Sequence, residues 1–271
     1  MDNTDTVSVI MACYNSEATL PKALDSILAQ TYSHWVVICC DDGSEDRSYE
    51  ILLDYQRRYP ERFVILRNEQ NRQLPYSLNR CLDLVTTELV ARMDADDVCL
   101  PERFEKQVRF LREHPDCDLV GTGLMITDGH EPIGVVIRPF SPTKECLLRS
   151  MPFSHGTIMT YRRVYAQLRG YRVDPSVLRV EDTDLWFRFF AAGFRGYNLQ
   201  EVLYVIVEDD AAIRRRTFRA RVNGVKTQWR GYQLLGFPKR AYLRPVFSLV
   251  KGLLPLRLYK FLHRLLLRRT T

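Results

Sequence analysis

Aspartates stand in clusters directly after apolar runs of the sequence, and one cluster has the spacing of a metal-binding motif. Asp94, Asp96 and Asp97 follow the apolar segment 88–93. Two carboxylates two residues apart in a loop can bind one Mg²⁺ or Mn²⁺, and that cation can bridge the phosphates of a substrate. A solvated acidic turn is the alternative for such a motif alone, but the position after an apolar strand favours the metal site.

Other polar residues admit two interpretations each. Asp41 and Asp42 follow another apolar run, where a carboxylate either accepts hydrogen bonds from a nucleobase or ribose or caps the next helix. Glu181 and Asp182 precede an aromatic segment, where a carboxylate either acts as a general base towards an acceptor hydroxyl or caps the helix. His155 either contributes to catalysis or acceptor binding, or is a structural hydrogen-bonding partner.

The elements that must position these residues alternate along the first half of the chain. Strands are predicted over 7–12, 35–40, 63–67 and 88–93, and helices over 17–30 (with Ser16 as N-cap), 46–58, 75–85 and 101–114. Such alternation is typical of an α/β fold, a mostly parallel sheet with helices on both faces. Ligands bind beyond the carboxyl ends of strands in these sheets, where the acidic clusters and Tyr14-Asn15 stand.

The second half of the sequence is less regular. Residues 119–160 contain two apolar runs that we interpret as strands, including antiparallel ones, and residues 143–150 are a candidate short helix. A buried helix is predicted over 183–192, closed by Gly193.

The charge of the chain is divided between an acidic body and a basic C-terminal segment. Residues 1–210 carry 23 Lys and Arg against 33 Asp and Glu, a net of −10, whereas the last 61 residues carry 16 Lys and Arg and no acid. Within 241–269 the basic side chains and the leucines occupy different sides of a helix that Pro255 interrupts or kinks. Such a helix either packs on the body or binds an anionic bilayer, and the lack of acidic residues favours the bilayer.

Several classes of protein are disfavoured. The seven cysteines include no C-x-x-C pair and the N-terminus is acidic, so we expect neither a zinc site nor secretion but a cytoplasmic protein. Neither G-x-G-x-x-G nor G-x-x-x-x-G-K-[ST] occurs, which disfavours Rossmann cofactor binding and P-loop chemistry. Because the body is acidic and no nucleic-acid module is recognisable, no nucleic acid is expected as a partner.

Five segments, taken together in order, resemble the family 2 glycosyltransferases of the GT-A fold. They read VSVIMACYNSEATL, ICCDDGSEDRS, NEQNRQLPYSLNRCL, ARMDADDVCLPERF and VEDTDLWFRF. The resemblance implies a Rossmann-like, mostly parallel sheet flanked by helices, a nucleotide-sugar donor, a divalent metal and inversion at the anomeric carbon. It implies a GT-A domain over 1–210, with a nucleotide-binding part over about 1–115 and an acceptor-binding part over about 116–210. A basic helical extension, 211–271, follows.

The resemblance also implies roles for individual residues. The nucleotide sugar would be bound by Ala12, Tyr14, Asn15, Glu17, Asp42, Arg72, Asp94 and Asp96. Within that set, Asp42 would contact a uracil-type base, Asp94 would face the ribose or the donor, and Asp96 would bind Mn²⁺ or Mg²⁺. Asp182 would be the catalytic base, with Glu181, His155 and Asp97 in acceptor-side or secondary positions.

The chain departs from the family pattern at two places. Ile206 and Val207 stand where family members often have an arginine and a histidine, and the three arginines 214–216 are candidates to replace a diphosphate contact. Gln73 stands near where some relatives place a base-contacting arginine, with Arg72 adjacent. The Q-x-x-R-W motif of processive synthases is absent, which indicates transfer of one sugar per encounter.

We therefore expect an inverting enzyme that moves one sugar from a UDP-hexose or UDP-N-acetylhexosamine to a hydroxyl of a glycan or a polyprenyl-diphosphate-linked acceptor. The pathway expected is surface polysaccharide synthesis, and residues 241–269 would hold the enzyme on the inner face of the cytoplasmic membrane. Two alternatives remain: a sugar nucleotidyltransferase, or a non-catalytic nucleotide-sugar-binding scaffold with a basic tail. The sequence indicates no oligomeric state.

Overall fold

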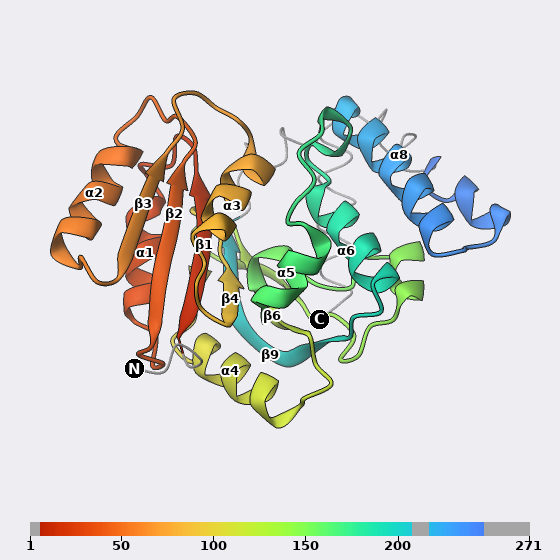
Figure 1. Cartoon of the computed structure of the whole chain (residues 1–271), viewed down its shortest axis with the longest axis horizontal. Helices are drawn as coiled ribbons and strands as arrows, with labels where there is room; N and C mark the ends of the chain where they lie inside the picture. The colour runs from red at the N-terminus through yellow and green to blue at the C-terminus, as the bar shows by residue number, and fades with distance from the viewer. Residues whose placement is uncertain (1–5, 208–216, 247–271) are drawn as a thin grey trace.

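The computed structural model describes residues 6–207 and 217–246, and in this part of the chain nine strands form one sheet (Figure 1). Across the sheet the strand order is β3–β2–β1–β4–β8–β6–β9–β5, and β7 pairs with the second half of β6. The strands are β1 (Val7–Cys13), β2 (Trp35–Asp41), β3 (Phe63–Arg67), β4 (Leu89–Arg92), β5 (Val98–Cys99), β6 (Leu119–Thr127), β7 (Pro132–Val136), β8 (Met159–Tyr161) and β9 (Gly196–Val207).

The direction of the strands divides the sheet into two parts. Strands β3, β2, β1 and β4 are parallel neighbours, and β6 and β9 form a second parallel pair. Short strand β8 runs antiparallel to both β4 and β6 and joins the two parts. The predicted α/β fold with a mostly parallel, mixed sheet is confirmed, and the antiparallel strands expected near 119–160 are present.

The helices predicted over 17–30, 46–58, 75–85, 101–114 and 183–192 are present with bounds that differ by a few residues, whereas the helix over 162–168 was not predicted. They are α1 (Leu20–Leu28), α2 (Ser48–Arg58), α3 (Leu74–Asp83), α4 (Arg103–Glu113), α5 (Arg162–Leu168), α6 (Glu181–Ala191) and α8 (Phe218–Leu234). Four 3₁₀ turns are also described: η1 (Lys144–Leu148), η2 (His155–Thr157), η3 (Pro175–Val177) and η4 (Lys239–Leu243). The short helix predicted over 143–150 is thus the 3₁₀ turn η1.

The predicted N-cap of the first helix is wrong. Helix α1 begins at Leu20, its N-cap position is Thr19, and Pro21 stands in its first turn. Ser16 instead contributes its backbone carbonyl, which accepts from the amides of Thr19 and Leu20. Proline lacks an N–H and has a fixed φ, so it favours the first turn of a helix and moves the start of α1 towards the C-terminus.

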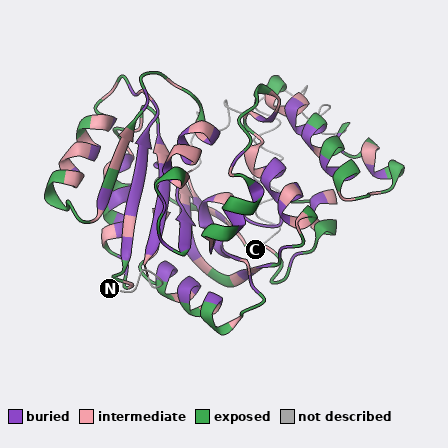
Figure 2. Ribbon diagram, in the orientation of Figure 1, coloured by how far each residue is buried: buried purple, intermediate pink, exposed green. Residues whose placement is uncertain are grey.

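The core lies on both faces of the sheet. Along β1, Val7, Val9 and Met11 pack with residues of α1, α2 and α4, whereas Ile10 packs with residues of α3, α5 and α6. This alternation follows from the two-residue period of a strand. Helices therefore cover both faces, and the strands between them are largely buried (Figure 2). Loops follow the carboxyl ends of the parallel strands.

Helix α8, the first part of the predicted basic extension, packs on α6. A Cβ added at Gly231 would lie 2.1 Å from the Phe187 ring, so glycine permits this close approach of the two helices. Tyr232 is completely buried beside it. Residues 247–269 of the predicted amphipathic segment lie outside the described residues. Among the helices of 6–207 and 217–246, none combines the length and apolar character that a bilayer span requires.

Candidate active site

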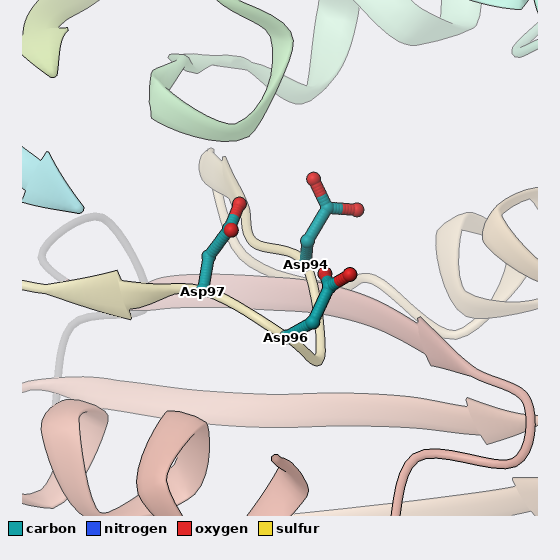
Figure 3. A group of neighbouring side chains, drawn as sticks. All are labelled: Asp94, Asp96 and Asp97. Carbon is teal, nitrogen blue, oxygen red and sulfur yellow. The ribbon is translucent and has the colours of Figure 1, made fainter. Parts of the chain in front are cut away.

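Asp94, Asp96 and Asp97 lie together in the loop between β4 and β5, and their side chains gather at one place (Figure 3). One carboxylate oxygen of each lies within 4.8 Å of the others. Burial, together with the negative charges of Asp94 and Asp96, raises the pKa of Asp97 well above its ordinary value. Three oxygen ligands whose charges repel one another fit a hard divalent cation such as Mg²⁺ or Mn²⁺, since a cation removes the repulsion.

Two buried residues that the sequence analysis did not single out hold Asp94. The terminal nitrogens of Arg92, in β4, pair with both carboxylate oxygens of Asp94. The hydroxyl of Tyr204, in β9, accepts a hydrogen bond from the Asp94 amide at 3.1 Å. Gly156 of η2 makes room for Tyr204, because a Cβ there would lie 2.8 Å from its hydroxyl oxygen. Asp94 is therefore fixed through both its main chain and its carboxylate.

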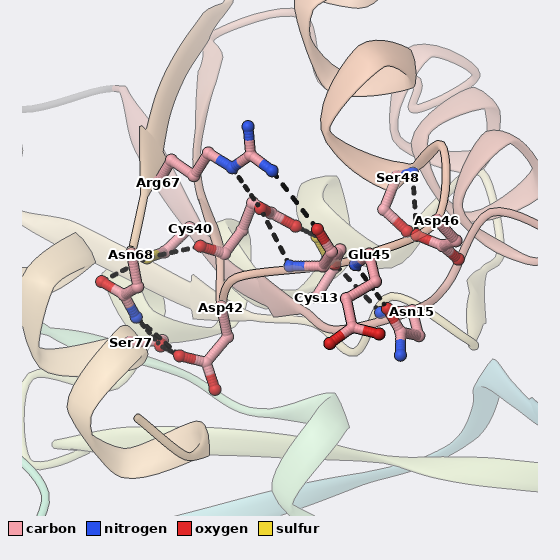
Figure 4. A network of polar contacts seen from close by, with 12 residues as sticks. Cys13, Asn15, Cys40, Asp42, Glu45, Asp46, Ser48, Arg67, Asn68 and Ser77 are labelled. Carbon is pink, nitrogen blue, oxygen red and sulfur yellow. Dashed lines mark hydrogen bonds and ion pairs between the residues drawn. The ribbon is translucent and has the colours of Figure 1, made fainter. Parts of the chain in front are cut away.

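The carboxylate of Asp42, at the end of β2, is buried and bound by the protein itself (Figure 4). Its Oδ1 accepts from Asn68 Nδ2 at 2.6 Å, Arg72 N at 2.8 Å and Ser77 Oγ at 2.9 Å. Its Oδ2 accepts from Gln73 N at 2.9 Å. Asp42 thus organises the turn before α3, and Oδ2 keeps the greater remaining capacity to accept a hydrogen bond from a nucleobase.

Arg72 and Gln73 reach Asp42 through their main chains. The side chain of Arg72 instead stacks over the Tyr76 ring, 4.8 Å from its centroid. Gln73 has a φ of 73°, a left-handed conformation that is uncommon for a residue other than glycine. The hydrogen bond from its amide to Asp42 accompanies this conformation. The alternative that Asp41 caps the next helix is not observed, since its carboxylate pairs with Arg67 at 3.3 Å and the N-cap position of α2 is Arg47.

The loop after β1 is tied to the loop after β2. Asn15 Oδ1 accepts from the amide of Glu45 at 2.9 Å, and Glu17 Oε2 accepts from the amide of Arg47 at 3.1 Å. Tyr14, which directly precedes Asn15, is 44% exposed and lines a pocket of about 630 Å³ together with residues 43–45 and 67–71. Asn15 and Glu17 therefore shape this pocket, and Tyr14 is available to a ligand within it. Ala12 is part-buried in β1.

Glu181 and Asp182 form the first turn of α6. Burial raises the pKa of Glu181 to about 7, with a further contribution from the Asp182 charge, and its Oε2 has no hydrogen-bond partner among the described residues. Burial also raises the pKa of Asp182, against hydrogen bonds from Thr183 N at 2.6 Å and Thr183 Oγ1 at 3.2 Å and the charge of Arg92. A carboxylate with a raised pKa is suited to accept a proton near neutral pH.

The alternative that these acids cap the helix is observed only in part. The N-cap position of α6 is Val180, which makes no side-chain capping hydrogen bond, but Asp182 Oδ1 accepts from the first-turn amide of Thr183 at 2.6 Å. Asp184, the other candidate, is buried and bridges Arg172 Nε at 3.0 Å and Arg188 Nε at 2.7 Å. Asp184 therefore holds α6 to its neighbours through two ion pairs. Glu181 and Asp182 remain the candidate bases of this segment.

His155 lies in η2 with a hydrogen-bonding partner. Its Nε2 is 2.8 Å from the Tyr171 hydroxyl, and its ring meets the Trp186 ring edge-on at 6.0 Å. Burial, and then the charge of Arg92, lower the pKa of His155 well below its ordinary value, so the imidazole is neutral. The structural hydrogen bond is thus observed, while a role of His155 in acceptor binding remains a prediction.

The region where the chain departs from the family pattern lies at the end of β9. Ile206 and Val207 pair with Ile126 and Thr127 of β6 and are part-buried. They supply apolar side chains to the sheet rather than a charged group. The arginines 214–216 lie outside the described residues. A diphosphate contact from that segment therefore remains a prediction.

The chain is similar in sequence to known proteins. The family described as Glycosyl transferase family 2 matches residues 8–169. EpsE of Bacillus subtilis, which is named as a glycosyltransferase, is 39% identical over 97% of this chain and 95% of its own length. The amylovoran biosynthesis glycosyltransferase AmsE of Erwinia amylovora is 29% identical over 94% of this chain and 97% of its own.

A further relative and two solved structures are similar. The UDP-Glc:alpha-D-GlcNAc-diphosphoundecaprenol beta-1,3-glucosyltransferase WfgD of Escherichia coli is 27% identical over 58% of this chain and 60% of its own. Residues 1–349 of TarS of S. aureus in complex with UDP-GlcNAc have a TM-score of 0.68 at 17% identity, covering 93% of this chain and 77% of that one. The mannosyltransferase PcManGT of Pyrobaculum calidifontis, with GDP-Man and Mn²⁺, has a TM-score of 0.66 at 18% identity, covering 90% of this chain and 71% of that one.

Proposed function

Because this chain belongs to glycosyl transferase family 2, we propose that it transfers one sugar from a nucleotide-sugar donor to a hydroxyl of an acceptor, with inversion. The observation that supports this most directly is the presence of two separate clusters of carboxylates. The cluster of Asp94, Asp96 and Asp97 suits the donor diphosphate, and Glu181-Asp182 suits the acceptor hydroxyl. Arg92 lies close enough to both groups to act on their charges.

The donor we propose is a UDP-sugar. The pocket beside Tyr14 adjoins Asp42 through Gly43 and Asn68, and this proximity supports a nucleobase bound near Asp42. A Cβ at Gly43 would lie 2.7 Å from the Gln70 main chain, so the two loops that border the pocket meet closely. The UDP-GlcNAc complex of TarS, which has the same fold, supports a uridine donor.

The residues that would hold the metal are Asp96, with Asp97 and Asp94 beside it. Three carboxylates within 4.8 Å of one another fit such an ion, and the Mn²⁺ complex of PcManGT supports a metal in this fold. When bound, Mg²⁺ or Mn²⁺ would offset the negative charge of the leaving diphosphate.

Side chains of this chain accept the proton and orient the groups that react. Asp182 accepts the proton of the acceptor hydroxyl while that oxygen forms a bond to C1 of the sugar. The bond from C1 to the diphosphate breaks on the opposite face, so the anomeric configuration inverts. Asp182 ends protonated, and the nucleoside diphosphate leaves with the electron pair of the broken bond. Arg92 stays charged throughout and binds Asp94.

Release of UDP tests the proposed function. With Mn²⁺ or Mg²⁺ present, the protein is expected to release UDP from a UDP-hexose or UDP-N-acetylhexosamine, and EDTA should stop the release. Incubation with a sugar 1-phosphate and a nucleoside triphosphate is the control, and formation of pyrophosphate there would instead identify a nucleotidyltransferase. Tight binding of UDP-sugars without turnover, across a panel of acceptors, would leave a non-catalytic binding protein.

We propose surface polysaccharide synthesis as the pathway, with a polyprenyl-diphosphate-linked sugar or a glycan as acceptor. The names of AmsE and WfgD refer to amylovoran biosynthesis and to a diphosphoundecaprenol acceptor, respectively. A lipid-linked acceptor would lie at a membrane surface. An enzyme that binds the inner face of the cytoplasmic membrane would meet it there.

The C-terminal part has features suited to such a surface. Trp229, Leu234 and Leu243, in α8 and η4, are 41%, 55% and 68% exposed, and no acidic residue follows Asp210 in the sequence. Apolar side chains beside Lys and Arg favour the interface of an anionic bilayer. Because α8 packs on α6, a membrane bound through α8 and η4 would lie at the end of the molecule where these helices stand (Figure 1).

Co-sedimentation with vesicles tests the membrane proposal. The full chain is expected to bind vesicles of anionic lipids at low salt, to bind neutral vesicles poorly and to be released by high salt, because Lys and Arg supply much of the attraction. A chain ending at Val246 should lose most of this binding while Ala241 and Tyr242 stay packed in the core. Equal binding of the shortened chain would assign the anchor to α8 and η4, and no binding by either form would contradict the proposal.

A further inference from the structure

Arg92 is a buried cation in the interior of the sheet. Its side chain is 3% exposed, and its neighbours in and beside β4, Val90, Ala91 and Met93, are at most 1% exposed. A buried charge is unfavourable unless it is paired, and a buried ion pair is often no more stabilising than an apolar pair of similar volume. The Arg92 Nε also lacks a hydrogen-bond partner among the described residues. Stability alone is therefore a poor explanation for an arginine at this position.

The contacts of Arg92 are concentrated on the donor side. Its two terminal nitrogens bind the two carboxylate oxygens of Asp94, an arrangement that fixes both the position and the rotation of the carboxylate. The main chain of Arg92 is held as well, since its amide donates to the Ile158 carbonyl at 3.0 Å and its carbonyl accepts from Arg103 Nη2 at 2.8 Å. The guanidinium is thus a rigid support for Asp94.

The charge of Arg92 also acts on the acceptor side. It lowers the pKa of both Glu181 and Asp182, against the larger effect of burial. The other charged groups that face this pair are Arg138, from the segment between β7 and η1, which acts on Asp182, and Arg179, which acts on Glu181. Arg138 is hydrogen-bonded to Ser154, and Arg179 precedes α6 by two residues, so Arg92 is the cation that reaches the pair from the sheet.

We propose that Arg92 is a positioning residue for the donor site, an inference that rests on the proposed glycosyl transfer. Its two terminal nitrogens hold both oxygens of Asp94 and so orient that carboxylate towards the donor.

Substitution tests this role, because lysine keeps the charge of arginine but not its fork of nitrogens. Arg92→Lys should leave the acid limb of the kcat–pH profile in place and raise the donor KM on the order of tenfold, since one ammonium cannot bind both oxygens of Asp94. Arg92→Met should raise the donor KM further and lower kcat on the order of 100-fold, because both hydrogen bonds to Asp94 are lost.

A matched control is Arg188, which pairs with buried Asp184 on α6. Arg188→Lys changes the geometry of a buried ion pair of the same kind and Arg188→Met removes it, and both should lower the melting temperature without changing the donor KM. A wild-type donor KM in Arg92→Lys would overturn the role of Arg92. If the wild-type chain itself transfers no sugar, the proposed function fails rather than the role of Arg92.

If Arg92→Met does not fold, Arg92→Lys and Arg92→Gln test the role of Arg92 in its place. Glutamine keeps one hydrogen-bond donor group for Asp94 but loses both the charge and the fork of nitrogens, so it should raise the donor KM at least as much as lysine does. Mn²⁺ binding, followed by its electron paramagnetic resonance signal, provides a readout without turnover. Both variants are expected to weaken that binding by a few-fold through loss of the fixed Asp94, and unchanged binding would contradict the donor-side role.

Discussion

Asp182→Asn is expected to lower the rate of sugar transfer by about three orders of magnitude, within the range observed when a general base is removed. An amide cannot accept the proton of the acceptor hydroxyl. The fold should persist, because the amide oxygen of the variant can still accept the hydrogen bonds that Asp182 Oδ1 accepts from Thr183 N and Thr183 Oγ1. Loss of the charge beside the N-terminus of α6 costs about 2 kcal/mol at most, the value for a partly buried charge at a helix end. Transfer is measured with donor and acceptor, and UDP binding by calorimetry.

Glu181→Gln is the matched control for this prediction. Glu181 neighbours Asp182 in the same helix turn and is also affected by burial, but Asp182 alone is assigned the proton transfer. The glutamine variant should keep most of its activity. A larger loss in Glu181→Gln than in Asp182→Asn would transfer the role of base to Glu181, whose pKa of about 7 also suits it. Loss of UDP binding in parallel with activity in Asp182→Asn would instead indicate a structural role.

The pH dependence of transfer has a definite direction. Activity requires ionised Asp182, so the rate should fall as the pH falls through its pKa in the site. Burial raises the pKa of Asp182 above that of an ordinary aspartate, so the fall should begin at a higher pH than an exposed carboxylate would give.

The order of strands and loops in the first half of the chain could be predicted because the signals there are local. Each parallel strand is a continuous apolar run, and residues 63–67 were predicted as a strand with the bounds that β3 has. Asp42, Asp94 and Tyr14 could be placed at the carboxyl end of the sheet because a strand end is visible in the sequence as the point where an apolar run stops.

The supports of the site could not be predicted, because they depend on contacts between distant residues. The Tyr204 hydroxyl meets the Asp94 amide across 110 residues of sequence, and the register of β9 decides that contact. Strand β5 has two residues, too few for a periodic pattern. Arg92 did leave a signal, a positive charge inside the apolar run 88–93, and an arginine there is a reason to look for a buried carboxylate partner.

The hydrogen bonds of Asp42 show the same limit. The sequence analysis left open whether Asp42 caps a helix or recognises a nucleobase. In the structure it accepts from the amides of Arg72 and Gln73 and holds the turn before α3. That turn includes a glutamine with a left-handed φ, which no residue pattern near 73 indicates. Local propensity therefore located the residue, while the folded loop determined its partners.

Asp96→Asn is expected to lower turnover by about two to four orders of magnitude and to weaken Mn²⁺ binding, while the protein stays folded. An asparagine keeps the size of the side chain but replaces a charged oxygen ligand with a neutral one, and hard divalent cations bind carboxylates more strongly. The leaving diphosphate then loses most of the positive charge that stabilises it in the transition state. Asp96 is part-buried at the surface of the loop, so its substitution should change the melting temperature little.

The measurement compares steady-state transfer with Mn²⁺ binding by electron paramagnetic resonance in the same preparations. Asp54→Asn is the control, because Asp54 lies on the outer side of α2, 51% exposed and paired with Arg57 and Arg58, and its loss removes one negative charge remote from the β4–β5 loop. The control should bind Mn²⁺ and turn over as the wild type does. If Asp96→Asn retains near-normal activity in a metal-dependent wild type, then Asp96 is not the ligand and the ion is held by Asp94 and Asp97.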